Sequence, residues 1–126
     1  NSISSELTNQ LTNRSSKYKS VLEVMKSVLE SIDKSYYTEA IEYNIVLNLE
    51  KTGTLFYMAI YMSIRDESLR TWGYLFGLFF QICDDYLDYS NDIEKGKPNF
   101  FILIPYTSGG IIIKKMLDIL NQSMNQ

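Results

Sequence analysis

Prolines are confined to the last third of the chain, at Pro98 and Pro105. Residues 14–90 therefore lack the residue that most strongly breaks helices, which favours long helices over many short strands. The length of 126 residues is enough for one domain with a substantial core but not for two, and the hydrophobic fraction of 45% argues against disorder over most of the chain. We predict a single all-α domain over residues 1–126.

Apolar residues recur at helical spacing along most of the chain, and polar stretches separate these segments. Thr38 is in a position to cap a helix, because an apolar helical pattern begins shortly after it. Residues 1–16 are polar and predict a frayed start with at most one short helix, and residues 91–99 predict a polar loop. The expected helices cover Tyr18–Ile32, Thr38–Thr52 continuing through Leu55–Ile64, about Leu69–Tyr89, and Ile111–Leu120 after Gly109-Gly110.

Charge and residue usage exclude several function classes. The net charge is −3 without a concentrated basic face, which argues against nucleic-acid binding. The chain has no histidine, so His-based nucleophilic triads and the usual zinc sites are excluded. Cys83 is the only cysteine, which suits a reducing compartment. The apolar run Trp72–Cys83 is shorter than the roughly 20 residues of a membrane span, and no leader is apparent, so we expect a cytoplasmic protein.

Three aspartates follow the most apolar stretch of the chain. Asp84, Asp85 and Asp88 share one helical face with Gln81, one turn earlier. Like charges 4 Å apart repel by about 4 kcal/mol at an effective dielectric constant of 20, and a divalent cation relieves that repulsion. Magnesium suits such oxygen ligands and keeps coordination positions for phosphate. The alternative is a solvated acidic helix end, but the apolar residues before it favour a metal site.

Two further elements carry lysines. Lys51 lies where an amphipathic segment becomes fully apolar, and there it could reach a phosphate, with the Thr52 hydroxyl adding a hydrogen bond. Alternatively, Lys51 is a surface lysine paired with Glu50 or Asp66. Residues 92–97 contain Gly96 and Lys97, and such a loop could close over a diphosphate or simply connect two helices.

Taken together in this order, the segments resemble the C-terminal half of a trans-type prenyl diphosphate synthase. The matching motifs are K-T-G-x-L-F at Lys51–Phe56, F-Q-I-x-D-D-Y-x-D at Phe80–Asp88, and D-I-x-x-G-K at Asp92–Lys97. The resemblance covers roughly Tyr36–Phe101. Within the family it is closest to the eukaryotic geranylgeranyl diphosphate synthases, and farnesyl diphosphate synthases share much of the pattern.

The resemblance implies an antiparallel helix bundle of the isoprenoid synthase type and usually a homodimer. It implies that isopentenyl diphosphate condenses with an allylic diphosphate to form geranylgeranyl or farnesyl diphosphate. Asp84, Asp85 and Asp88 would bind Mg²⁺. Lys51 and Lys97 would contact the allylic diphosphate. Thr52 and Gln81 would help stabilise the allylic cation.

The chain also departs from the family pattern. Residues 1–83 contain no paired aspartates, so the first aspartate-rich motif is absent, as are the basic residues that bind isopentenyl diphosphate. The stretch from Asp84 to Asp92 is shorter than usual, and Asn99 replaces the usual Ser or Thr. We interpret the chain as part of a longer enzyme with a mobile loop missing near Asn91. The alternatives are a degenerate relative and a non-catalytic helical subunit that forms a heterodimer with a complete synthase and modulates it.

Overall fold

The computed structural model describes residues 16–53 and 67–124. Every regular element among them is helical, which confirms the predicted all-α class. The expected helix over Leu55–Ile64 and most of the expected frayed start lie outside the described residues. The elements are α2 (Lys19–Ile32), α3 (Glu39–Asn48), the π-helical turn η1 (Leu49–Gly53), α5 (Glu67–Leu87), α6 (Tyr89–Lys95), the 3₁₀ turns η2 (Phe100–Ile102) and η3 (Tyr106–Ser108), and α7 (Gly109–Met124).

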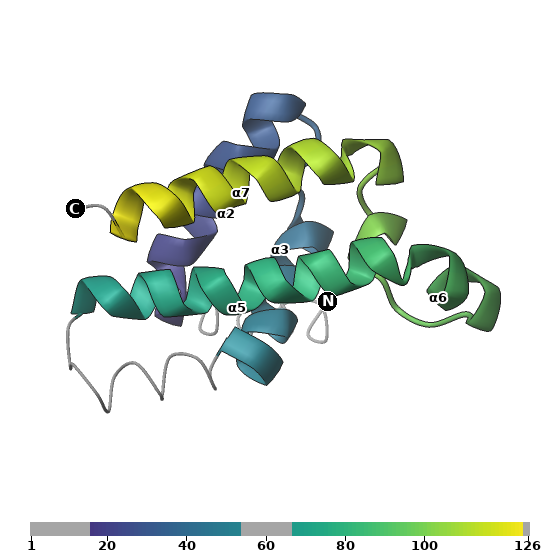
Figure 1. Cartoon of the computed structure of the whole chain (residues 1–126), viewed down its shortest axis with the longest axis horizontal. Coiled ribbons are helices and arrows are strands. Elements are labelled where there is room, and N and C mark those ends of the chain that lie inside the picture. Colours follow the sequence, from purple (N-terminus) through teal and green to yellow (C-terminus); the bar gives the residue numbers. More distant parts are fainter. Residues whose placement is uncertain (1–15, 54–66, 125–126) are drawn as a thin grey trace, which may run out of the picture.

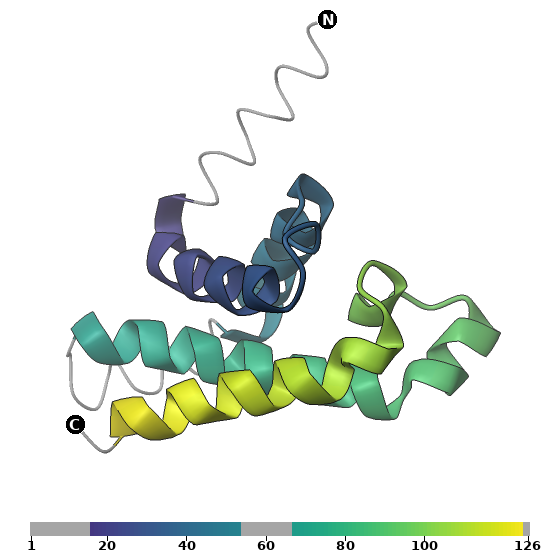
Figure 2. The ribbon, with the colours of Figure 1, turned by 90° about the horizontal axis from the view of Figure 1, so that it is seen from above.

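Helices α5 and α7, the two longest in the described residues, lie side by side and run in opposite directions (Figure 1). The indole N–H of Trp72, near the start of α5, donates a 3.1 Å hydrogen bond to the carbonyl of Leu120, near the end of α7. Seen from above, α2 and α3 lie to one side of this pair, and α6 extends beyond the end of α5 (Figure 2). The arrangement places η1 against α5.

One hydrophobic core joins these helices. Helix α2 contributes Val21, Leu22, Met25 and Leu29 to it, and α3 adds Ile41 and Ile45. Burying a large aliphatic side chain stabilises the fold by about 1.5–3 kcal/mol, so this shared core holds the helices together. The residues with no exposed surface are Met25, Leu29, Ile45, Val46, Leu49, Leu78, Ile82, Phe100, Ile112 and Met116.

The predicted cap at Thr38 is confirmed. Its hydroxyl accepts a 3.2 Å hydrogen bond from the backbone N–H of Ile41, and its backbone is extended, as an N-cap requires. The helix then continues through η1, where Leu49 is fully buried. The expected continuity from α3 toward Thr52 therefore holds, although the turn widens from α- to π-helical geometry.

Two predictions about the second half of the chain were wrong. The expected polar loop at residues 91–99 is mostly the short helix α6, which ends at Gly96 with a left-handed backbone (φ 67°). The diglycine expected to precede the last helix is instead its first turn. Gly109 is buried there because the rings of Tyr86 and Phe101 occupy the space that a Cβ would need. No helix in the described ranges is long and apolar enough to cross a membrane.

Candidate diphosphate and metal site

A pocket of about 390 Å³ lies at the aspartate end of α5. Four parts of the chain form it: α3 with η1, the end of α5, the middle of α6, and the segment that follows α6. Carboxylates, amides and lysines dominate its wall, so it suits a small anionic ligand together with a cation. The residues lining it are Asn44, Asn48, Lys51, Gln81, Asp84, Asp85, Asp88, Asp92, Lys97, Pro98, Asn99 and Phe100.

The pocket brings together nearly all of the residues that the sequence singled out. Lys51 comes from η1 and Lys97 from the segment after α6, and both are exposed at the same cavity as the aspartates. This proximity is a tertiary result, because Lys51 and Asp84 are distant in sequence. Thr52 belongs to η1, but its side chain lies outside the described part of the structure. The roles assigned to these residues remain predictions.

Lys51 lies in the π-helical turn η1, two residues after the buried Leu49. Leu49, at the start of η1, has a backbone N–H shared between the carbonyls of Ile45 and Val46, and its side chain is buried. Two residues later the chain exposes Lys51 at the pocket. Single π-helical turns interrupt α-helices frequently at functional sites, because they redirect side chains without breaking the helix. The turn η1 thus has one residue in the core, Leu49, and another at the pocket, Lys51.

The three aspartates are less alike than the sequence suggested. Helix α5 ends at Leu87, so Asp88 lies at the junction with α6 and its side chain makes no capping hydrogen bond. Asp84 and Asp88 are exposed, whereas Asp85 is partly buried. The two carboxylate oxygens of Asp85 accept hydrogen bonds from the Gln81 side-chain amide (3.2 Å) and from the backbone N–H of Phe100 (2.9 Å). Asp85 therefore connects two chain segments, and Asp84 and Asp88 present their carboxylates to solvent.

Burial also distinguishes Asp85 electrostatically. Loss of hydration raises the pKa of the Asp85 carboxyl, and the hydrogen bonds from Phe100 and Gln81 offset part of that increase. The negative charges of Asp92 and Asp84 raise the pKa further. A nearby cation would reverse this effect of the acidic neighbours.

Asn99 is a pocket residue whose role the sequence analysis missed. Only 4% of its surface is exposed. Its amide nitrogen donates to the backbone carbonyl of Asp85 (2.8 Å) and to the carboxylate of Asp92 (3.0 Å), and its amide oxygen accepts from the backbone N–H of Phe101 (2.9 Å). One available signal was that an asparagine directly before an apolar run is a typical N-cap, and Asn99 does cap η2.

The carboxylate oxygens of the pocket fit a magnesium ion whose other ligands come from a phosphate and from water. In residues 16–53 and 67–124, no three acidic or cysteine side chains are close enough to hold a metal by themselves. Magnesium, however, usually keeps several waters and binds through one or two carboxylates plus substrate phosphates. Asp84 and Asp88 can supply such carboxylates. The three aspartates therefore do not form a complete metal site by themselves in the described residues, and which of them binds Mg²⁺ stays a prediction.

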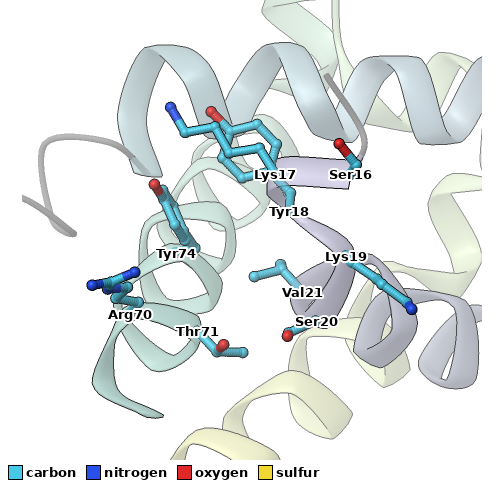
Figure 3. Close-up of a pocket in the computed structure, with 9 residues that line it drawn as sticks. All are labelled: Ser16, Lys17, Tyr18, Lys19, Ser20, Val21, Arg70, Thr71 and Tyr74. Carbon is cyan, nitrogen blue, oxygen red and sulfur yellow. The ribbon is translucent and has the colours of Figure 1, made fainter. Parts of the chain in front are cut away.

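A second pocket, of about 250 Å³, lies near the start of α5, where that helix meets the beginning of α2. Its wall includes Lys17, Lys19 and Arg70 (Figure 3). The ammonium group of Lys17 lies 5.5 Å from the ring centre of Tyr18, and the side chain of Lys19 points away from Arg70. Because these cations do not converge, the aspartate pocket is the stronger candidate for binding a phosphate.

Comparison with known families shows to which family the chain belongs. A sequence profile described as Polyprenyl synthetase matches residues 7–100. This chain belongs to the polyprenyl synthetase family. The match includes Lys51, the three aspartates and Lys97, and it begins well before Tyr36, where the recognisable motifs start. Neither the curated proteins nor the solved structures gave a significant match.

Membership of the polyprenyl synthetase family confirms the general expectation of a prenyltransferase, and the helical architecture agrees with the isoprenoid synthase type of fold. The pocket lies within the part of the chain that the family profile matches. It is therefore the natural place to look for isoprenoid diphosphate chemistry.

Proposed function

We propose that this chain is a magnesium-dependent trans-prenyltransferase whose aspartate pocket binds the diphosphate of an allylic substrate. The observation that supports this most strongly is that Lys51 and Lys97 line the same cavity as Asp84 and Asp88. Lysines alone would suit any anion, and aspartates alone any cation. The combination suits a metal–diphosphate complex, in which both kinds of charge are needed.

The reaction begins when the bond between the allylic carbon and the diphosphate oxygen breaks and its electron pair leaves with the diphosphate. Lys51 and Lys97 stabilise the charge that develops on this leaving group. Bound Mg²⁺ would supply further charge neutralisation there, held by Asp84 and Asp88. Isopentenyl diphosphate then attacks the allylic cation through its double bond, and loss of a proton completes the product.

Two other residues contribute to this site. The Gln81 amide is oriented by its hydrogen bond to Asp85, so it presents a fixed dipole beside the pocket. Thr52 remains the second residue proposed to stabilise the allylic cation. The same proposal assigns Asp85 an indirect role, because its carboxylate is already bonded to Gln81 and Phe100. We further propose geranylgeranyl diphosphate, or alternatively farnesyl diphosphate, as the product of a cytoplasmic homodimer.

Isothermal titration with geranyl diphosphate tests the binding part of this proposal. We expect binding in the presence of Mg²⁺, little binding after chelation, and at least about tenfold weaker binding in Asp84→Ala, since each charge-assisted contact is worth about 1.5–3 kcal/mol. Asp118→Ala is the matched control, because Asp118 is equally an exposed helical aspartate but lies on α7, away from the pocket. Equal affinity with and without Mg²⁺ would refute the proposal.

A second candidate is a non-catalytic subunit that pairs with a complete synthase. The observation favouring it is that residues 1–83 contain no paired aspartates. Condensation of labelled isopentenyl diphosphate by the purified chain alone separates the two candidates. Turnover supports the enzyme, whereas binding without turnover, restored by an added synthase, supports the subunit.

A further inference from the structure

The backbone that carries Lys97 is anchored on both sides. On one side, Gly96 adopts a left-handed conformation that ends α6, and the Lys97 N–H donates a 2.8 Å hydrogen bond to the carbonyl of Asp92. This pairing is the Schellman arrangement of a helix C-terminus. On the other side, the Phe100 N–H is bonded to the carboxylate of Asp85. The backbone at Lys97 is therefore held between α6 and the end of α5.

Asn99 links these two anchors. Its amide nitrogen has two hydrogens, and both are used: one reaches the carbonyl of Asp85 on α5 and the other reaches the carboxylate of Asp92 on α6. Its amide oxygen accepts from Phe101. Two acceptors around the nitrogen and one donor at the oxygen also fix which way the amide is turned.

No other side chain of this size meets the same requirements. Aspartate would keep the cap on Phe101 but has no hydrogens to donate and would face the carboxylate of Asp92. Serine has a single hydroxyl hydrogen and a shorter reach. Because Asn99 is almost fully buried, any donor or acceptor left without a partner there would carry the desolvation penalty of a buried polar group.

We propose that Asn99 is a positioning residue that fixes the Lys97 segment against the aspartate end of α5, and that it acts on ligand binding through Lys97. This inference rests on the proposed function, since it assigns Lys97 to the diphosphate. Asn99 itself does not have to touch the ligand. Its contribution is that the backbone carrying Lys97 is already in place when the diphosphate arrives, so less ordering of this segment is needed on binding.

The test is a double-mutant cycle read by titration with inorganic diphosphate in the presence of Mg²⁺. Asn99→Asp preserves size and the cap but removes both donated hydrogen bonds. We expect it to weaken binding about tenfold, the lower end of the effect seen when groups that orient a site are removed. In a Lys97→Gln background the same substitution should weaken binding by about twofold or less, because coupled residues are not additive.

Asn91→Asp is the matched control. Asn91 is an exposed residue of α6, so the substitution adds the same negative charge without removing a bond of the Asn99 network. A purely electrostatic or globally destabilising effect of Asn99→Asp would persist in the Lys97→Gln background, and that result would overturn the inference.

If Asn99→Asp does not fold, the swap Asn99→Asp with Asp92→Asn restores the net charge and one hydrogen bond. Recovery of binding in the swap supports the inference, and a folded swap that binds no better than Lys97→Gln contradicts it.

Hydrogen exchange separates this inference from the proposed function. If the wild-type chain binds no diphosphate, the proposed function fails, whatever Asn99 does. Exchange at the amides of Lys97, Phe100 and Phe101 then tests the positioning directly. Faster exchange in Asn99→Asp than in Asn91→Asp supports the anchoring of the segment, and equal exchange in the two variants refutes it.

Discussion

The backbone N–H of Phe100 donates a 2.9 Å hydrogen bond to the carboxylate of Asp85, and this contact ties the turn after α6 to the end of α5. The adjacent Asp84 remains exposed at the pocket. Two neighbouring aspartates of one motif thus have different surroundings, because successive residues of a helix point in different directions. One aspartate holds the pocket together, and the other is available to a ligand.

The raised pKa of Asp85 predicts how stability depends on pH. Over the range from the ordinary aspartate pKa of about 3.9 up to the raised value, the folded chain keeps a proton that the unfolded chain has lost. The free energy of unfolding contributed by this group therefore falls as pH rises through that range and is constant above it. Urea denaturation of wild type and Asp85→Asn across this range should show wild type losing stability relative to the variant. If Asp85→Asn instead lost stability relative to wild type as the pH rises, the result would contradict the prediction.

Gly109 and Gly110 form a natural pair of test positions at the start of α7. A Cβ at Gly109 would overlap the ring of Tyr86, which is itself stacked on Tyr106 with ring centres 4.7 Å apart. Gly109→Ala should lower the free energy of unfolding by about 1–3 kcal/mol, as overpacking does. A Cβ at Gly110 meets nothing within 4 Å, so Gly110→Ala should be neutral or raise stability by about 0.4–1 kcal/mol. Thermal denaturation distinguishes the two, and equal effects would argue against the close contact with Tyr86.

Gly96 should be replaceable only by residues that tolerate a left-handed backbone. Its φ of 67° costs an alanine about 1–2 kcal/mol, whereas asparagine adopts this conformation more readily. Gly96→Ala should therefore destabilise the chain more than Gly96→Asn, although nothing lies within 4 Å of the added Cβ. Denaturation midpoints of the two variants provide the measurement, with the opposite order as the contradicting result.

Cys83 should react slowly while the chain is folded. Burial raises the pKa of its thiol, and the negative charge of Asp84 adds to the effect, so less thiolate is present at a pH near the ordinary value of about 8.5. Alkylation by iodoacetamide should accelerate in urea, which removes both influences. Asp84→Asn should accelerate it modestly without urea. Identical rates in native and denaturing buffer would show that the thiol is not shielded.

Local signals explain which parts of the fold were predictable. The Thr38 cap and the apolar face of α2 depend on residues within a few positions of one another, and both were recognised. The helix α6 was mistaken for a loop because it has no buried residue, so no hydrophobic period marks it. Polar residues in a short exposed helix look the same in sequence as polar residues in a connection.

The pocket was likewise hard to predict from local sequence signals, because its residues are distant from one another in the chain. The proximity of Lys51 to Asp84 was predicted from family resemblance, since nothing local to either residue requires it. The bridging role of Asn99 was not predicted, because its partners, Asp85 and Asp92, are on different helices and come together only in the folded chain. Its usefulness depends on burial and on matched donors and acceptors, neither of which a sequence displays.

The most direct test is to locate the divalent ion that binds when a diphosphate is present. Paramagnetic Mn²⁺ accepts the same oxygen ligands as Mg²⁺ and broadens the nuclear magnetic resonance signals of nearby amides. In a titration with inorganic diphosphate, we predict that the signals of Asp84, Asp88 and Lys97 broaden first, while that of Arg70 near the start of α5 stays sharp. Strongest broadening away from the aspartate pocket, or the same broadening with no diphosphate added, would contradict the account.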